Sequence, residues 1–382
     1  MAFNLEHAFL RLVAGQSPGA AAAAARGLLG LAEAGYAAAV RRRNTRFDAD
    51  QARSRQLPRP VVSVGNLTTG GTGKTPVVRW LAARLIERGH RPAVLTRGYK
   101  SADGVSDEAA LLARPLPGFG AAPHVVVDPN RIAGAGRALA EQPETTCFLL
   151  DDGFQHRRVR RDLDIVLIDA TQPFGFGRLL PRGLLREPTT SLARADVVMI
   201  TRRQLVDATA LERLTRQLAG MTAAPVMAIG DELSGFEPLT NAPGKPDGEV
   251  QAGPVLAGPV LAACGIGNPE AFAASLRRVL TGPVSLLPLP DHARFGEAEL
   301  DRIAGAAARV GARAVVVTEK DAVKLGASAE RRLGLPLLWA RQSLVIGDGD
   351  VGRLLGLVEG AMVRYSGKCR VGSAGNPGRS GR

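Results

Sequence analysis

The sequence has few aromatic residues and few cysteines, and charged residues interrupt its N-terminal apolar run. Phe, Trp and Tyr make up 4% of the 382 residues. The three cysteines, Cys147, Cys264 and Cys369, are far apart and form no C-x-x-C pair. This spacing argues against a disulfide framework or a zinc site and fits a reducing cytosol. The formal net charge of +13 comes without zinc-finger spacing or an aromatic RNA-binding signature. We therefore expect no nucleic-acid partner, and an anionic membrane face or a phosphorylated substrate explains the basic balance better.

Residues 1–44 differ in composition from the rest of the chain. A run rich in Ala and Leu, 20–40, leads to three arginines at 41–43, and Arg26 and Glu33 interrupt it. It therefore lacks the clean apolar length of about 20 residues that spans a bilayer, and it is a poor secretory signal. An interfacial helix with its basic end near anionic headgroups fits better. The alternative, an ordinary helix packed on the domain, is compatible with this, because one face can pack while the other contacts lipid.

A strand, a glycine-rich turn and a helix follow one another from Val61 to Gly89. The β-branched run 61–64 predicts a buried strand, and a helical pattern after Lys74 stops near Gly89. Backbone N–H groups of such a turn face phosphates, Lys adds a point charge, and a Thr hydroxyl binds Mg²⁺. Thr68 stands where the usual pattern has Gly, and Gly70 and Gly71 supply backbone freedom nearby. The predicted triphosphate-binding residues are Thr68, Thr69, Gly70, Gly71, Thr72, Gly73, Lys74 and Thr75.

Apolar strand patterns alternate with helical patterns along most of the chain, which predicts an α/β fold. The first domain, 45–233, has candidate strands at 61–65, 92–96, 124–128, 146–150, 164–169, 196–201 and 225–229. This rhythm is typical of a P-loop NTPase-type, mainly parallel sheet with helices on both faces. A Pro- and Gly-rich stretch, 234–258, is expected to be a linker or ribbon. A second, smaller α/β domain follows at 259–365, and a basic tail, 366–382, is expected to be disordered.

Polar residues follow the predicted strands, where ligands of such sheets bind. Asp151 ends the strand at 147–150, as does the Mg²⁺-orienting acid of P-loop enzymes. Asp152 and Gln155 are candidates to support the site from behind or to orient a water molecule. His156 is expected to be an ordinary surface residue. Asp107 and Glu108 open a helical stretch, where they serve either chemistry or the helix dipole.

Two further groups of residues suggest chemistry. The loop 174–188 carries Arg178, Arg182 and Arg186 among apolar side chains. The arginines suit a phosphate group, and the apolar side chains suit an apolar ligand or the membrane. The alternative is a packed loop with solvated arginines. In the second domain, Asp291 and His292 follow an apolar segment. This pair is a second candidate catalytic spot, although a lone His is more often structural.

Several motifs together resemble the tetraacyldisaccharide 4'-kinase family of lipid A synthesis in Gram-negative bacteria. They extend from the glycine-rich turn to near residue 325, and the string Asp-Asp-Gly-Phe-Gln-His at 151–156 is the most specific of them. In that family Thr is also usual at the position of Thr68. The other matching stretches are 65–76, 97–99, 106–108, 177–181, 185–188, 264–269, 291–292 and 318–324.

The resemblance implies transfer of the ATP γ-phosphoryl group to the 4'-hydroxyl of a tetraacylated glucosamine disaccharide 1-phosphate, giving lipid IVA. It implies two α/β domains with the active site in the cleft between them, and an N-terminal segment bound to the cytoplasmic face of the inner membrane. By motif, Asp107 and His292 would form the base. We expect these two residues to lie in different domains, so that closure would assemble the base.

The remaining expected roles concern phosphates, metal and substrate. Lys74 would hold the β- and γ-phosphates, and Mg²⁺ would bind Thr75 with one or more of Asp151, Asp152 and Glu108. Arg178, Arg182 and Arg186 are candidates for the acceptor's 1-phosphate or lipid headgroups. Tyr99 and Gln155 are further candidate substrate contacts, and no obligate protein partner is inferred.

Two other function classes share some of these features. A P-loop GTPase or ATPase acting as a switch or metal-insertion factor explains the turn and the acids. It leaves the N-terminal segment unexplained, and 318–321 has the wrong spacing for a guanine-reading Asn/Thr-Lys-x-Asp. A non-catalytic membrane adaptor is disfavoured by the intact Lys74, Thr75, Asp151 and Asp107.

Overall fold

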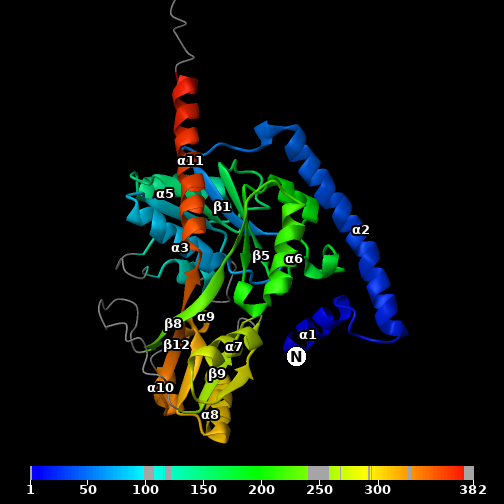
Figure 1. The fold of residues 1–382 in the computed structure, drawn as a ribbon, viewed down its shortest axis with the longest axis vertical. Helices are drawn as coiled ribbons and strands as arrows, with labels where there is room; N and C mark the ends of the chain where they lie inside the picture. The colour runs from blue at the N-terminus through cyan, green and yellow to red at the C-terminus, as the bar shows by residue number, and fades with distance from the viewer. Residues whose placement is uncertain are drawn as a thin grey trace, which may run out of the picture. The chain divides into compact units, whose positions relative to one another are not determined.

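The computed structural model describes residues 2–98, 107–114, 116, 122–239, 258–266, 268–290, 293, 295–325 and 328–373. The chain divides into two compact units, each built on its own sheet (Figure 1). The larger unit comprises Leu29–Gly98, Pro123–Ile229 and Ile346–Arg382. The smaller unit comprises Met1–Leu28, Tyr99–Ala122 and Gly230–Val345.

The larger unit contains a seven-stranded sheet in which every pair of neighbouring strands is parallel. The order β3-β2-β4-β1-β5-β6-β7 places β1 at the centre, between β4 and β5. The carboxyl end of β1 therefore lies at a topological switch point, where open α/β sheets bind ligands. The strands are β1 (Val61–Asn66), β2 (Pro92–Thr96), β3 (His124–Val127), β4 (Cys147–Asp151), β5 (Leu163–Asp169), β6 (Val197–Thr201) and β7 (Val226–Ala228).

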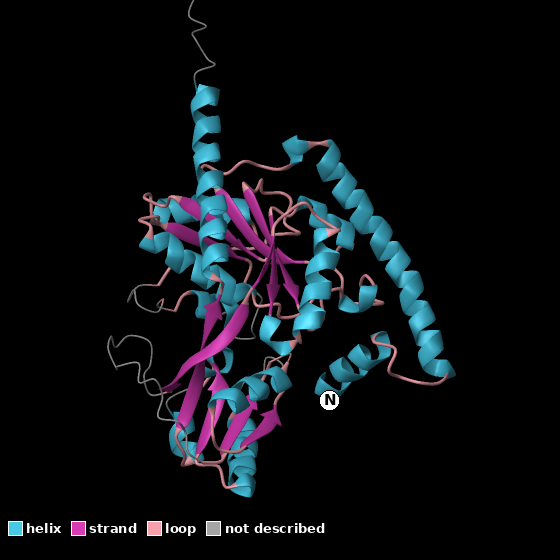
Figure 2. Ribbon diagram, in the orientation of Figure 1, coloured by secondary structure: helices cyan, strands magenta, loops and turns pink. Residues whose placement is uncertain are grey.

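Helices cover both faces of this sheet (Figure 2). Side chains of α5 pack with Val61, Leu95 and Phe148 from three strands. The alternate residues Val62 and Leu149 are equally buried, so the opposite face is covered as well, and α3 contacts β1, β2 and β4. The continuous apolar strands are thus explained by burial on both faces. The helices of this unit are α3 (Lys74–Glu87), α5 (Arg131–Glu141), α6 (Ala208–Ala219) and α11 (Asp348–Ser373), with 3₁₀ turns η1 (Gln51–Arg53), η2 (Gly175–Gly177), η3 (Thr189–Arg194) and η4 (Arg203–Leu205).

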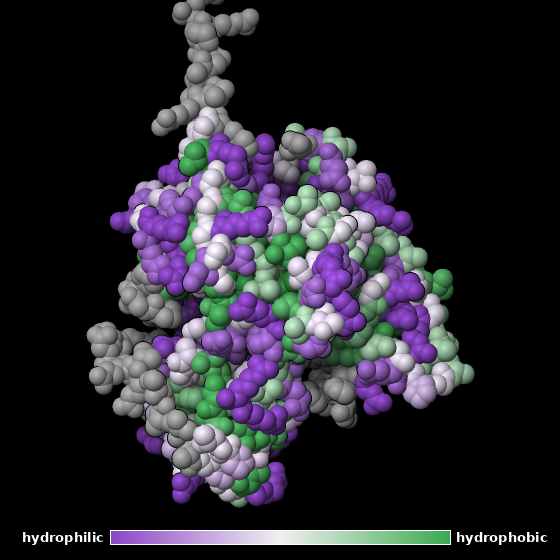
Figure 3. All heavy atoms as spheres, viewed as in Figure 1, coloured by the Kyte–Doolittle hydropathy of each residue, from purple (hydrophilic) through white to green (hydrophobic). Residues whose placement is uncertain are grey.

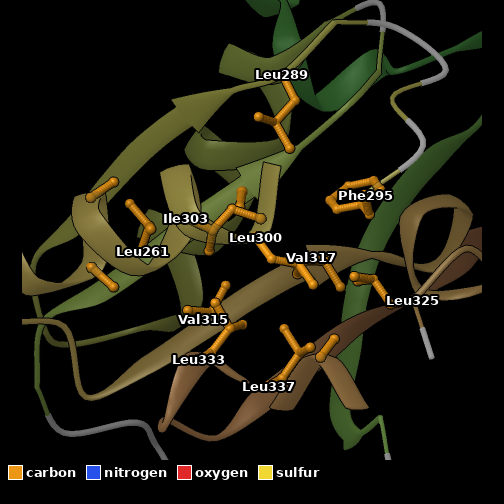
Figure 4. Close-up of a cluster of buried hydrophobic side chains, with 14 of the residues drawn as sticks. Leu261, Leu289, Phe295, Leu300, Ile303, Val315, Val317, Leu325, Leu333 and Leu337 are labelled. Atoms are coloured by element: carbon orange, nitrogen blue, oxygen red, sulfur yellow. The ribbon is translucent and has the colours of Figure 1, made fainter. Parts of the chain in front are cut away.

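The smaller unit has a five-stranded sheet in the order β10-β9-β11-β12-β8. The first four strands of that order pair in parallel, whereas β8 pairs antiparallel with β12. Leu261, Ile303, Val315 and Leu337 contribute to its main core (Figure 4). The elements are α4 (Asp107–Leu112), β8 (Gly230–Pro238), β9 (Val260–Cys264), α7 (Pro269–Val279), β10 (Val284–Pro288), α8 (Glu297–Val310), β11 (Ala314–Thr318), α9 (Glu319–Ala322), α10 (Ser328–Leu333) and β12 (Leu337–Val345).

Three boundaries differ from those expected from the sequence. Helix α4 groups with the smaller sheet because it contacts α9. Just after the helix, the guanidinium carbon of Arg114 lies 4.6 Å from the centre of the Trp339 ring. The stretch expected as a linker from 234 begins as part of β8. Helix α11 groups with the larger unit, where the Tyr365 hydroxyl donates to the Leu57 carbonyl at 2.7 Å. This helix continues to Ser373, so the expected disorder from 366 is wrong as far as 373.

The N-terminal segment forms α1 (Ala2–Val13) and α2 (Ala20–Ala49), so the second helix passes beyond the expected boundary at 44. Among the described residues, no helix combines the length and the apolar character needed to cross a bilayer. The helices expected from the sequence are therefore present. On the face drawn in Figure 3, hydrophilic and hydrophobic side chains are mixed along α2.

Candidate active site

The glycine-rich turn after β1 has the backbone that its glycines predict. Strand β1 ends at Asn66 and α3 begins at Lys74. Gly70 has φ of 106° and Gly73 has φ of 84°, a left-handed region that side chains disfavour. Thr68 is absent from the positive-φ residues of the described chain, which is why Thr replaces Gly there without strain. Gly73 is the N-cap of α3, so the unpaired N–H groups of the first helical turn lie next to the turn.

The loop that carries the arginines holds the first half of the turn. Thr69 N donates to the Leu184 carbonyl at 2.8 Å, and Arg186 N donates to the Leu67 carbonyl at 2.7 Å. Thr68 also forms an isolated bridge with Leu185. The nucleotide-type turn and the arginine loop, 174–188, are therefore joined through their backbones.

Lys74 lies against polar groups from two neighbouring strands. Its Nζ is 3.3 Å from Asn66 Oδ1 and 3.5 Å from Asp152 Oδ1. Arg186 Nη1 approaches the other oxygen of Asp152 at 2.7 Å. Burial on its own raises the pKa of the Asp152 carboxyl, but Lys74 and Arg186 outweigh it and hold that pKa below its usual value. An ionised carboxylate thus positions both cations beside the turn.

Asp151 and Asp152 reach this position because β4 lies next to β1, with Asp151 paired in register to Val64. Thr96 Oγ1 donates to Asp151 Oδ2 at 3.0 Å, and both side chains are buried. Asp152 adopts φ of 53°, which turns the chain sharply after the strand. The structure therefore brings Asp151, Asp152 and Lys74 together, as predicted from the polar residues that follow the strands.

The residues of this edge suit Mg²⁺. Thr75, Asp151 and Asp152 supply one hydroxyl and two carboxylates, the oxygen ligands that this ion prefers. Mg²⁺ usually keeps several waters and binds one or two carboxylates together with substrate phosphates, so these donors are compatible with it.

The three arginines of the loop occupy different environments. Arg186 is mostly covered and is held by Asp152, and it lies 3.5 Å from Gln155 Oε1. Arg178 is 61% exposed and lies 3.9 Å from Glu33 of α2, and Arg182 is half-buried. Of the three, Arg186 is seen to contact Asp152 beside the turn, and the role of all three as candidates for the 1-phosphate or headgroups stays a prediction.

Gln155 and His156 contribute to the local structure. Gln155 Nε2 donates to the Asn66 carbonyl at 2.7 Å, which joins the loop after β4 to the end of β1. His156 is half-buried, and burial together with Arg131 and Arg161 lowers its pKa to about 4. His156 is therefore not the plain surface residue that was expected, because its side chain is half-buried beside two arginines.

A buried Glu187 cluster was missed from the sequence. Glu187 is fully buried, where it pairs with Arg43 and lies 2.7 Å from Arg194 Nη2. Asn44 Nδ2 donates at 3.2 Å to Glu187 Oε2, the oxygen that Arg194 also contacts, so α2 is fixed to the arginine loop. Burial on its own raises the pKa of Glu187. Arg194 and Arg43 outweigh burial and hold that pKa below its usual value, so the carboxyl group is ionised. The sequence signal was the string Arg-Glu-Pro after an apolar pair, which indicates a turn but does not name a distant partner.

The remaining predicted residues are only partly covered by the structure. The backbone of Asp107 and Glu108 opens α4, whereas their side chains lie outside the described part. Tyr99, Asp291 and His292 lie wholly outside the described residues. Asp107 opens α4 in the smaller unit. Because His292 lies outside the described residues, the expectation that the two residues belong to different domains stays a prediction.

Comparisons with known proteins agree on one family. The model of the tetraacyldisaccharide-1-P 4'-kinase family, LpxK, matches residues 25–355. The chain is 40% identical over 342 residues to the tetraacyldisaccharide 4'-kinase of Geobacter sulfurreducens, covering 85% of this chain and 91% of that protein. It is 38% identical to the enzyme of that name from Anaeromyxobacter dehalogenans strain 2CP-C, covering 81% of this chain and 84% of that protein.

A solved structure shares the fold. LpxK from Aquifex aeolicus, crystallised in complex with ATP, superposes with a TM-score of 0.65 at 24% identity. The match covers 88% of this chain and 99% of that one. This chain therefore belongs to the tetraacyldisaccharide 4'-kinase family, a family of ATP-dependent kinases of lipid A biosynthesis.

Proposed function

We propose that this chain transfers the γ-phosphoryl group of ATP to the 4'-hydroxyl of a tetraacylated glucosamine disaccharide 1-phosphate, which gives lipid IVA. The observation that carries the proposal is the arrangement at the carboxyl end of β1. There a left-handed glycine turn, the start of α3, Lys74 and the Asp151–Asp152 pair converge in a member of this kinase family.

The triphosphate would lie along the turn from Thr68 to Thr75. Its backbone N–H groups and the positive end of α3 favour an anion, and Lys74 adds a full charge near the β- and γ-phosphates. Asp152 lies 3.5 Å from Lys74 Nζ and would hold this cation beside the turn before the nucleotide arrives. Placing charge in advance lowers the barrier of a reaction that depends mainly on positioning and neutralisation.

Mg²⁺ would be held by Thr75 and by one or more of Asp151, Asp152 and Glu108. When bound, the ion neutralises negative charge on the β- and γ-phosphates. Asp151 is suited to this role because Thr96 Oγ1 fixes one of its oxygens at 3.0 Å.

The carboxylate of Asp107 would accept the proton of the 4'-hydroxyl, and His292 would orient it. The new bond forms between the 4'-oxygen and the γ-phosphorus while the bond from that phosphorus to the β,γ-bridging oxygen breaks, and ADP leaves with that oxygen. A sugar hydroxyl is a weak nucleophile, so a base close to the γ-phosphate favours transfer.

The acceptor and the membrane would be recognised by the basic surface. Arg178, Arg182 and Arg186 are our candidates for the 1-phosphate or nearby headgroups, and Tyr99 and Gln155 for other substrate contacts. Arg186 would act closest to the nucleotide, because it already bonds Asp152. The net charge of +13 and the N-terminal helices support peripheral binding to the cytoplasmic face of the inner membrane.

The roles of Asp107 and His292 can be tested by comparing Asp107→Asn and His292→Ala with wild type. The assay follows transfer of labelled γ-phosphate to the disaccharide 1-phosphate in detergent micelles, beside ATP affinity measured without acceptor. We expect kcat to fall by about 100-fold or more for Asp107→Asn with little change in ATP affinity. Asp301→Asn, which removes an exposed carboxylate of α8, is the control. Unchanged turnover in both site variants would remove these residues from the proposed base.

A further inference from the structure

We propose that Asp169, Thr201 and Arg202, which we call the clasp, preset the second half of the phosphate-binding turn for ATP. The inference rests on the proposed kinase function and adds positioning residues to it. Asp169 ends β5 and Thr201 ends β6, and the two residues are direct neighbours in the register of the sheet. Arg202 follows immediately after β6.

The clasp contacts the turn through two consecutive carbonyl groups. Arg202 Nη2 donates to the Gly71 carbonyl at 2.6 Å, and Thr201 Oγ1 donates to the Thr72 carbonyl at 3.0 Å. The other terminal nitrogen of Arg202 pairs with Asp169 Oδ2. The remaining oxygen of Asp169 accepts from the backbone and hydroxyl of Thr171 at 2.9 and 2.7 Å. Both oxygens of Asp169 are therefore engaged, and the guanidinium is fixed between Asp169 and Gly71.

Fixing these carbonyls also fixes the N–H groups that follow them. A trans peptide unit is planar, so its carbonyl and the next N–H point in opposite directions. Holding the Gly71 carbonyl orients the N–H of Thr72, and holding the Thr72 carbonyl orients the N–H of Gly73. These donors come directly before Lys74, where a phosphate-binding turn needs its N–H groups aimed at the ligand.

The turn needs this support because glycine leaves its backbone free. A Cβ at Gly70 or Gly71 would meet nothing within 4 Å, so packing does not restrain that part. The first half of the turn is held by the backbone of Leu184 and Arg186. The second half is held by the clasp, and the methyl group of Thr201 lies 3.7 Å from where a Gly73 Cβ would be.

The backbone of Arg202 is itself unusual. Its φ of 57° is left-handed, a conformation that is unfavourable for a non-glycine residue. This backbone allows the side chain to reach Gly71 and Asp169 together. The planar fork of arginine suits two acceptors at once, whereas the point charge of lysine serves such a site less well.

The clasp predicts a specific kinetic effect for Arg202→Gln. The affinity for ATP, measured by calorimetry with MgATP and no lipid acceptor, should fall by about 10- to 100-fold, as for loss of a charge-assisted hydrogen bond. The KM for ATP in the transfer assay should rise by a similar factor, while kcat changes less than about threefold. Arg202→Lys should recover part of the affinity.

The matched control is the adjacent arginine. Arg203 Nη1 donates to the Ala228 carbonyl at 3.0 Å, away from the turn, so Arg203→Gln should leave ATP affinity unchanged. Asp169→Asn should weaken ATP binding as Arg202→Gln does, and the double variant should be no worse than the single ones, because they remove one device.

Two results would overturn the clasp. One is an unchanged ATP affinity in Arg202→Gln, and the other is a fall in kcat with an unchanged KM for ATP. If Arg202→Gln fails to fold, Thr201→Val, which keeps the packed methyl and removes the hydroxyl donor, must still weaken ATP binding for the proposal to stand. Because binding is read without the acceptor, a wrong acceptor assignment would leave this test intact.

Discussion

Asp152 shows how one residue links sequence, backbone and charge in this site. It follows a buried strand, adopts a left-handed backbone and forms ion pairs with Lys74 and Arg186, which come from different segments. Removing either cation would leave the partly buried carboxylate less well compensated, and such uncompensated charge is costly. The carboxylate therefore organises Lys74 and Arg186 before any nucleotide is bound.

His156 makes a pH prediction at the same scale. Burial, Arg131 and Arg161 lower its pKa in the folded chain to about 4, below the unfolded value of about 6.5. The unfolded chain therefore binds more protons between these values, and stability must fall as the pH falls from 6.5 toward 4. His156→Asn should reduce the pH dependence of the urea midpoint over this window. An identical pH profile in both proteins would contradict the assigned environment of His156.

At the scale of elements, α2 is attached to the arginine loop by polar contacts. Besides the Glu187 cluster, the Tyr36 hydroxyl donates to the Arg186 carbonyl at 2.9 Å, and Leu179 N donates to Glu33 Oε1 at 2.8 Å. The N-terminal segment is thus both a packed helix and a candidate membrane element, as the sequence allowed. Its attachment lies beside the residues that hold the first half of the phosphate-binding turn.

Glu187→Gln should weaken this attachment. Glu187 is fully buried and compensates two arginines, so removing its charge should cost about 3 kcal/mol of unfolding free energy. Urea denaturation at pH 7 measures this loss. Glu212→Gln, at an exposed pair on α6, should change stability by less than about 0.5 kcal/mol. Equal stability of Glu187→Gln and wild type would show that the buried pair does not stabilise the fold.

The elements themselves could be predicted from sequence, whereas their grouping could not. Hydrophobic runs and glycine stops located the strands of the larger sheet because burial on both faces leaves a local signature. Strand β8 of the smaller sheet was missed, since part of it was expected to be a linker. The grouping of α4 and α11 depends on contacts such as Arg114 with Trp339 and Tyr365 with Leu57. These partners are far apart in sequence, so no local pattern indicates them. Asp151 and Asp152 could be found because they directly follow an apolar strand. The partners of Glu187 and of the clasp lie far away in sequence, so these groups were missed.

At the scale of the molecule, the basic charge and the N-terminal helices point to an anionic surface. Leu28 and Leu31 are 69% and 74% exposed on α2, and a spacing of three residues places them on the same side of the helix. Apolar side chains with a basic helix end are typical of helices that lie in a membrane interface. We propose that this side of α2 contacts lipid.

Replacing Leu28 and Leu31 together by Ser should lower binding to vesicles of mixed zwitterionic and anionic phospholipid by about tenfold or more, since two apolar contacts are lost. Vesicle flotation measures the bound fraction. Val363→Ser on α11, which is 72% exposed, controls for loss of an exposed apolar side chain elsewhere. Unaltered binding of the α2 variant would exclude this side of α2 as the lipid contact.

The most direct test of the central claim is phosphoryl transfer to an acceptor with and without its 4'-hydroxyl. Labelled ATP is incubated in micelles with the tetraacyl disaccharide 1-phosphate or with its 4'-deoxy analogue, using wild type and Lys74→Ala. The account predicts labelled lipid only for wild type with the intact acceptor, and a loss of about 100-fold or more in Lys74→Ala. Equal labelling of the 4'-deoxy acceptor, or ATP hydrolysis with no labelled lipid, would contradict it.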